Sequence, residues 1–149
     1  MSAPSPATHA VATDICDYTM AALDDLRALP QWMPYRIATR RDGRCTKIPC
    51  HWQTGRPADA HDPTNHTTYE QAIGAAQRYF RDGTRMFDGS GFVLTERDSF
   101  YLVDLDHVID TDGTIAPGAL AIVQQLDTYT EISRSGRGLH CIGRGAIPA

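Results

Sequence analysis

The chain has 149 residues, of which 42% are hydrophobic and 21% are charged, and its formal net charge is −4. This length predicts one domain with a core of its own, and the composition is ordinary for a globular protein. No apolar run approaches the roughly 20 residues needed to cross a bilayer, and residues 1–12 lack the positive charge and apolar core of a signal peptide. We therefore expect a cytoplasmic protein without a membrane partner.

The N-terminal part is predicted to contain a leader, a helix and a strand. Residues 1–13 are rich in Ala, Pro, Ser and Thr and lack periodicity, so we expect a disordered leader before one domain over residues 14–149. Apolar residues near helical spacing predict a helix over residues 18–29. Residues 31–39 resemble a strand, in which Pro34 indicates an edge position or a bulge.

A long loop and a second helix follow. Residues 40–65 contain glycines, prolines and turn-forming pairs, which predicts mostly loop or a loosely paired hairpin. Thr67 and Glu70 match a capping box, and the helix they begin is expected over residues 68–81. The side chains expected to face the core are Tyr69, Ala72, Ile73, Ala76, Tyr79 and Phe80.

The C-terminal part alternates strands with one helix. A strand over residues 92–95 is predicted to form a hairpin with the strand over residues 100–108. Residues 118–126 are predicted to be helical, with Ile122 among the inward residues, and a glycine-rich turn is expected to join strands over residues 129–133 and 139–143. Because helices alternate with hairpins, we expect an α+β (mixed α/β) domain with a largely antiparallel sheet flanked by helices.

Two carboxylates lie two residues apart in an otherwise apolar run. In a strand, Asp104 and Asp106 would point to the same side while Val103 and Leu105 face a core. Two neighbouring carboxylates repel each other, and a divalent cation between them relieves the repulsion. The pair therefore indicates a Mg²⁺ or Mn²⁺ site, although solvent-facing residues of a half-exposed strand would show the same spacing.

The glycine-rich turn has the composition of a phosphate site. Glycines two residues apart allow backbone N–H groups to converge on an anion, while hydroxyl and guanidinium groups add donors. A tight hairpin with glycines at positive φ and an ordinary half-buried histidine is the alternative. The candidate phosphate-binding residues are Ser135, Gly136, Arg137, Gly138 and His140.

Basic residues are unevenly distributed along the chain. The segment from Arg27 to Arg56, both included, contains seven basic residues and one acid. This suits a polyanion such as nucleic acid, with Arg40, Arg41 and Arg44 as candidate contacts, although a solvated basic loop would look the same. Lys47 is the only lysine in a sequence with 13 arginines, and its compact ammonium group suits a phosphate.

The four cysteines, Cys16, Cys45, Cys50 and Cys141, form no CxxC motif, so we expect reduced thiols. A zinc site could be assembled from Cys45, Cys50 and His51 with His61 and His66 downstream, but their intervals match no familiar ligand spacing.

Several short motifs follow one another after the leader. They are Leu29-Pro30-Gln31-Trp32 with Tyr35-Arg36, Lys47-Ile48-Pro49, Thr54-Gly55, Asp62-Pro63, Gly91-Phe92-Val93-Leu94, Val103-Asp104-Leu105-Asp106, and Tyr129-Thr130-Glu131-Ile132-Ser133 leading through Ser135-Gly136-Arg137-Gly138-Leu139-His140. Their order and spacing resemble the primase-polymerase domains of phages and plasmids, which belong to the archaeo-eukaryotic primase superfamily.

The resemblance implies a primase-like catalytic core that makes and extends primers. The implied reaction is template-directed nucleotidyl transfer from nucleoside triphosphates on DNA, with magnesium or manganese. Asp104 and Asp106 match the family's metal-binding motif, and His140 with Ser135 matches the motif that contacts the incoming triphosphate. Lys47 matches a family lysine.

Two departures from the family pattern leave the enzymatic activity open. Arg134 stands where relatives often have proline, and the family's third metal-binding acid, on a strand beyond the second motif, is expected past Ala149. The helicase region of many relatives is likewise not among these residues. Either the chain is C-terminally incomplete, or its activity is reduced or lost. Asp110, Asp112 and Glu131 are candidate substitutes, although the first two fall in a predicted turn and the third already matches a family position.

Three functional hypotheses follow. The first is a DNA primase-polymerase domain acting in phage, prophage or plasmid replication, with DNA, nucleoside triphosphates and a helicase region or protein as partners. The second is a non-catalytic domain that binds nucleic acid or nucleotides. The third is a metal-dependent nuclease that uses the same carboxylates.

Overall fold

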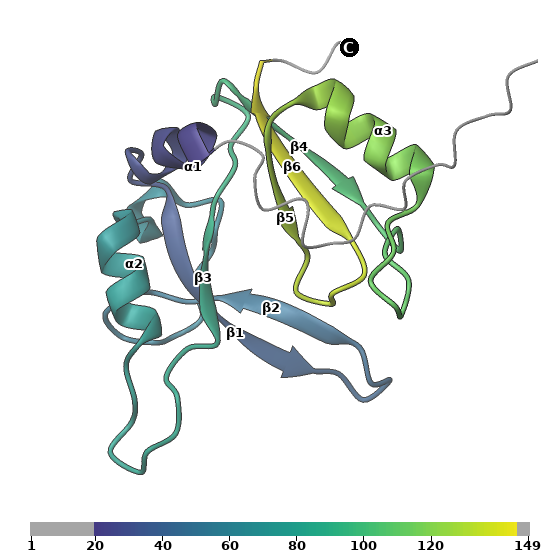
Figure 1. The fold of residues 1–149 in the computed structure, drawn as a ribbon. Helices are drawn as coiled ribbons and strands as arrows, with labels where there is room; N and C mark the ends of the chain where they lie inside the picture. The colour runs from purple at the N-terminus through teal and green to yellow at the C-terminus, as the bar shows by residue number, and fades with distance from the viewer. Residues whose placement is uncertain (1–19, 146–149) are drawn as a thin grey trace, which may run out of the picture. The chain divides into compact units, whose positions relative to one another are not determined.

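The computed structural model describes residues 20–145, with side chains from residue 23 onward. The chain divides into two compact units (Figure 1). The unit called N-terminal below is Asp24–Asp98. The other, called C-terminal below, combines residues 99–149 with residues 1–23, and its described residues are 20–23 and 99–145. Each unit contains one three-stranded sheet with antiparallel strand pairs, which confirms a mixed α/β class. The leader expected over residues 1–13 lies outside the described residues.

The N-terminal unit is built on the sheet β2-β1-β3. Helix α1 (Met20–Arg27) precedes the central strand β1 (Trp32–Thr39), which pairs with β2 (Cys45–Pro49) and β3 (Gly89–Phe92). Helix α2 (Tyr69–Ala76) packs against β1 and β3. Strands β1 and β2 form the hairpin that was one of the alternatives for residues 40–65, and a short 3₁₀ helix, Pro63–Asn65, lies in the loop after β2.

Trp32 joins the elements of this unit. Its side chain is 7% exposed, and its Nε1 donates a hydrogen bond of 3.0 Å to the Leu26 carbonyl. The indole ring also makes edge-on contacts with Tyr69 and Phe92, with ring centroids 4.8 and 5.4 Å apart. A large ring whose polar atom has a partner buries apolar area without leaving an unpaired donor.

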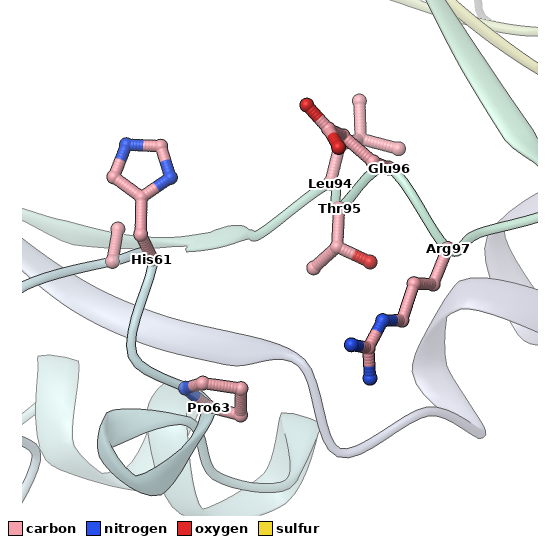
Figure 2. Close-up of a pocket in the computed structure, with 7 residues that line it drawn as sticks. His61, Pro63, Leu94, Thr95, Glu96 and Arg97 are labelled. Carbon is pink, nitrogen blue, oxygen red and sulfur yellow. The ribbon is translucent and has the colours of Figure 1, made fainter.

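The N-terminal unit also contains a pocket of about 480 Å³ (Figure 2). It is lined on one side by Ala60, His61 and Pro63 and on the other by residues 94–97. The side chains of His61 and Arg97 lie on opposite sides of it (Figure 2). Pro63 and Leu94 belong to the motifs that carry the family resemblance, so this pocket lies beside segments with a recognisable sequence pattern.

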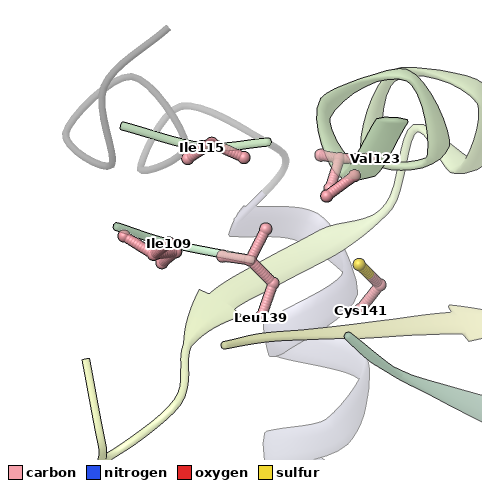
Figure 3. Close-up of a cluster of buried hydrophobic side chains, with 6 residues drawn as sticks. Ile109, Ile115, Val123, Leu139 and Cys141 are labelled. Atoms are coloured by element: carbon pink, nitrogen blue, oxygen red, sulfur yellow. The ribbon is translucent and has the colours of Figure 1, made fainter. Parts of the chain in front are cut away.

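The C-terminal unit is built on the sheet β4-β6-β5. Strand β6 (Leu139–Arg144) lies between β4 (Phe100–Leu105) and β5 (Tyr129–Ile132), and helix α3 (Pro117–Leu126) precedes β5. The buried hydrophobic side chains of this unit gather between α3, β6 and the segment after β4 (Figure 3). They are Ile109, Ile115, Ala119, Val123, Leu139 and Cys141.

The predicted hairpin between residues 92–95 and 100–108 is wrong. Strand β3 pairs with β1, whereas β4 pairs with β6 in the other sheet. The Asp98 carboxylate accepts hydrogen bonds from the Thr95 N–H at 2.7 Å and from Gln31 Nε2 at 2.9 Å. The backbone N–H of Val93 also donates to the Gln31 carbonyl. These bonds hold the segment after β3 beside the start of β1, so no tight turn folds it onto β4.

Pro34 lies in the central strand and not at an edge. The pairing of β1 with β2 ends at the pair Tyr35 and Pro49, so the N–H that Pro34 lacks falls beyond the β1–β2 ladder. Its carbonyl still accepts a hydrogen bond from the Cys50 N–H at 2.9 Å. A proline is therefore accommodated in a central strand without the loss of a ladder bond.

Helix α2 is shorter than expected and begins with a different cap. Thr68 caps it with Gln71 as the capping-box partner, in place of Thr67 and Glu70. The helix ends at Ala76, and Tyr79 and Phe80 are 56% and 43% exposed instead of buried. Within the following loop the Phe80 N–H donates to the Thr84 carbonyl, and the Asp82 carboxylate accepts from the Thr84 N–H and hydroxyl. This local turn replaces the last helical turns.

The remaining C-terminal elements agree with the prediction. Helix α3 and the final strand pair are confirmed, although Ile122 is 39% exposed and does not face the core. None of the helices among residues 20–145 has the length and apolar character needed to span a bilayer.

Candidate active site

Three charged or titratable side chains form a row across the sheet of the C-terminal unit. In the pairing register, His140 on β6 lies opposite Asp104 on β4 and opposite Glu131 on β5. Residues directly opposite each other on antiparallel strands share one face of the sheet. The histidine that the sequence places after the glycine-rich turn is therefore flanked by one carboxylate on each side.

The histidine ring lies close to both carboxylates. Nε2 of His140 is 3.7 Å from Oδ1 of Asp104, and Nδ1 is 3.2 Å from Oε1 of Glu131. The His140 side chain is 23% exposed, whereas those of Asp104 and Glu131 are 51% and 45% exposed. The face of the sheet that carries this row is thus open enough for a solute to reach the acids.

Asp106 lies just beyond the end of β4. The predicted strand over residues 100–108 is too long, because β4 ends at Leu105 and His107 adopts a left-handed backbone with φ of 55°. The N–H groups of Val108 and Ile109 then both donate to the Arg137 carbonyl and do not extend the β4 ladder. Within the described residues the Asp106 carboxylate has neither a hydrogen bond nor an ion pair, and it is exposed like Asp104.

The glycine-rich turn is closed by its own hydroxyl groups. The N–H groups of Gly138 and Arg137 donate to Ser133 Oγ at 3.0 Å and Ser135 Oγ at 3.3 Å. The Gly136 N–H donates to the Ser133 carbonyl, and Gly136 has a positive φ of 73°. In this arrangement the N–H groups of residues 136–138 are bonded within the turn.

At Gly138 the turn passes close to the end of β4. A Cβ atom there would lie 2.9 Å from the Leu105 carbonyl oxygen and 3.1 Å from Ser133 Oγ. Real Cβ atoms essentially never approach backbone oxygen so closely, so this position requires glycine. The close approach, together with the bonds to the Arg137 carbonyl, brings the Asp106 segment against the turn.

The predicted site residues therefore fall into two groups, one in each unit. Asp104, Asp106, His140 and the turn over residues 135–138 all lie in the C-terminal unit around β4 and β6. Arg40, Arg41, Arg44 and Lys47 belong to the N-terminal unit.

These four basic residues are on the β1–β2 hairpin. The exposed residues Arg40, Arg41 and Arg44 lie in its connecting loop, and Lys47 lies on β2. The Lys47 ammonium is 4.9 Å from the centroid of the Tyr35 ring. A cation over an aromatic face is attracted by the ring, and the Lys47 residue is exposed.

The oxygen donors of Asp104 and Asp106 suit a hard divalent cation such as Mg²⁺ or Mn²⁺. Among residues 20–145, however, there is no group of three His, Cys, Asp or Glu side chains that could hold a metal ion. The zinc alternative finds no support in this part of the chain, where Cys50 is buried with its Sγ directed to the Ile48 carbonyl.

The contact between Glu131 and His140 was not predicted from the sequence, where Glu131 was only a candidate substitute for a further acid. The signal was available in the hairpin, because Ile132 and Leu139 flank the turn as a pair and the next pair outward is Glu131 with His140. Counting outward from a turn identifies cross-strand neighbours once the turn length is known.

Comparison with known proteins agrees with the resemblance seen in the motifs. The chain matches no protein-family model. Over 128 residues, which are 85% of its length, it is 34% identical to a DNA primase-polymerase of Nitratiruptor phage NrS-1. The aligned part spans 16% of that relative. The identity over most of this chain, together with the ordered motifs, supports a primase-polymerase domain of phage type.

Proposed function

We propose that this chain is the part of a DNA primase-polymerase that binds the catalytic metal ions and the incoming nucleotide. The single observation that supports it most is the grouping of Asp104, Asp106, His140 and the glycine-rich turn around strands β4 and β6 of the C-terminal unit. In this proposal β4, β6 and β5 belong to the catalytic core of an archaeo-eukaryotic primase fold. The reaction is template-directed nucleotidyl transfer during replication of phage, prophage or plasmid DNA.

Asp104 and Asp106 would hold Mg²⁺ or Mn²⁺. The bound cation would neutralise the charge that develops on the phosphates during the transfer. Asp104 lies on β4 and Asp106 directly follows it, and both side chains are exposed and so accessible to a cation.

The triphosphate would be bound by side chains of the turn and by His140. Because the N–H groups of residues 136–138 are bonded within the turn, we assign phosphate binding chiefly to the Ser135 hydroxyl, the Arg137 guanidinium and the His140 ring. Gly136 and Gly138 would give the turn the shape that presents these groups. Lys47 would supply a further point charge for a phosphate.

The test is nucleotide incorporation on primed and unprimed single-stranded DNA, with the protein in the longest form that its reading frame encodes. We expect incorporation that requires Mn²⁺ or Mg²⁺ and that is lost when Asp104→Ala and Asp106→Ala are combined. Glu96→Gln, an exposed carboxylate in the other unit, is the matched control and should leave the activity unchanged. No incorporation by the wild-type protein with any template, triphosphate or metal would refute the proposal.

A non-catalytic DNA-binding role is the second candidate. It is favoured by the exposed arginines of the β1–β2 hairpin and by the lack of a three-ligand metal group among residues 20–145. Here DNA binding should survive the loss of both aspartates and weaken when Arg40, Arg41 and Arg44 are replaced by Ala. The dependence of log K on log salt should become shallower by roughly 0.7–0.9 for each phosphate that the protein no longer neutralises. Cleavage of DNA with magnesium and without triphosphate would indicate the nuclease alternative instead.

A further inference from the structure

The carboxylate of Glu131 is held at both oxygens. Oε1 lies 3.2 Å from Nδ1 of His140, and Oε2 accepts a hydrogen bond of 2.9 Å from the Tyr129 hydroxyl. Tyr129 and Glu131 are two residues apart on β5, so both side chains lie on the same face of the sheet. A carboxylate with a partner at each oxygen has a defined orientation, and Glu131 therefore presents Oε1 to the imidazole.

The contact between Glu131 and His140 determines which ring nitrogen faces Asp104. An ionised carboxylate only accepts hydrogen bonds, so Nδ1 of His140 must carry the hydrogen that points to Glu131. That holds for the neutral ring and for the protonated ring alike. In both states Nε2 is presented on the side of Asp104, where the distance to Oδ1 is 3.7 Å.

Glu131 is not placed to share a cation with Asp104. The two residues lie on strands that flank β6, and the His140 ring lies between their carboxylates. Oxygen ligands of Mg²⁺ must all come within about 2.0–2.1 Å of the ion. A carboxylate separated from Asp104 by an imidazole ring that contacts both is therefore a partner of the histidine and not a further ligand beside Asp104.

We propose that Glu131 is a positioning residue for His140, and that Tyr129 in turn holds Glu131. Glu131 fixes the ring with Nδ1–H directed away from the aspartates and Nε2 directed toward the triphosphate. The effect on nucleotide binding rests on the proposed function, whereas the orientation of the ring does not. For histidines that bind a metal, removing the residue that orients the ring costs about 10–100-fold in metal affinity or activity, and we expect an effect at the lower end of that range for His140.

The experiment measures the two consequences separately. The ¹⁵N chemical shifts of the neutral His140 imidazole are recorded in the intact protein without metal or nucleotide, for the wild type and for Glu131→Ala, Glu131→Gln and Tyr129→Phe. We expect the wild type to have Nδ1 protonated and Glu131→Ala to gain the Nε2–H tautomer. Glu131→Gln keeps an oxygen acceptor and should retain most of the wild-type tautomer, and Tyr129→Phe should show a smaller change than Glu131→Ala.

Steady-state incorporation gives the second readout. Glu131→Ala should raise KM for the nucleoside triphosphate about tenfold with a smaller change in kcat. Glu131→Gln should recover most of this loss, and the control Glu96→Gln should leave KM unchanged.

The outcomes distinguish the proposal from the function on which it builds. Unchanged His140 shifts in Glu131→Ala would overturn it, whatever happens to KM, because Glu131 would then act by another route. An altered tautomer with an unchanged KM would show that Glu131 positions the ring and would overturn the effect of this positioning on nucleotide binding. If the wild-type protein incorporates no nucleotide, the proposed function fails, and the ¹⁵N shifts alone decide whether Glu131 positions the ring.

Discussion

Replacing Gly138 with alanine should destabilise the C-terminal unit through one steric conflict. The new Cβ would lie 2.9 Å from the Leu105 carbonyl oxygen, which is backbone and cannot rotate away, and 3.1 Å from Ser133 Oγ. Forcing an extra carbon into a closely packed position costs about 1–3 kcal/mol. Displacing Ser133 would also weaken the hydrogen bond that its hydroxyl accepts from the Gly138 N–H, which adds about 1 kcal/mol.

We therefore expect Gly138→Ala to lower the free energy of unfolding by about 2–4 kcal/mol. For a chain of this size the melting temperature should fall by roughly 2–4 °C for each kcal/mol. Thermal and urea unfolding, followed by circular dichroism, would measure the change.

Two other glycines provide controls. Gly136 has open space around it but a φ of +73°, so Gly136→Ala should lose about 1–2 kcal/mol from backbone strain alone. Gly118 lies in the first turn of α3 with nothing within 4 Å of its Cβ position, and Gly118→Ala should stabilise the helix by up to about 1 kcal/mol. A wild-type melting curve for Gly138→Ala, or an equal loss in Gly118→Ala, would show that the close approach to Leu105 does not determine the stability of the turn.

Three further predictions concern other parts of the fold. Trp32→Phe should cost about 1–3 kcal/mol, because the buried Leu26 carbonyl loses its donor, and urea unfolding would measure it. Thr68→Ala should lower the free energy of unfolding by about 1 kcal/mol, because the α2 cap is lost, whereas Thr68→Ser should keep most of the stability of the cap. Wild-type stability for Thr68→Ala would contradict the role of Thr68 as the cap. Burial raises the pKa of the Cys141 thiol above its usual value of 9.0. The stabilisation that comes from burying the neutral thiol is therefore complete below about pH 9 and is lost as the pH rises further. Under native conditions between about pH 7 and 9, iodoacetamide should therefore modify exposed Cys45 well before Cys141, which mass spectrometry would detect.

Sequence patterns were sufficient where an element depends on contacts close in the chain. The hairpin of β5 and β6 was predicted because its turn, its glycines and its alternating side chains lie within a few residues of one another. The same holds for α3, whose apolar residues repeat at helical spacing after Pro117. Asp104 and His140 were identified as candidates from these local patterns and from the family motifs.

Contacts between distant segments decided the rest. Gln31 and Asp98, which are 67 residues apart, hold the segment after β3 beside β1, and this separates β3 from β4 into different sheets. The end of α2 depends on a local turn that competes with helix formation, and helical periodicity does not report such competition.

The candidate site shows the same division. The sequence by itself determined which residues have the right chemistry: two aspartates, a histidine and a glycine-rich basic turn. Only the tertiary structure decided that Glu131 faces His140 and that Asp106 lies past the end of its strand against the turn. The physical reason is that a local pattern specifies the face on which a side chain lies, whereas its neighbour across the sheet depends on strand pairing and register.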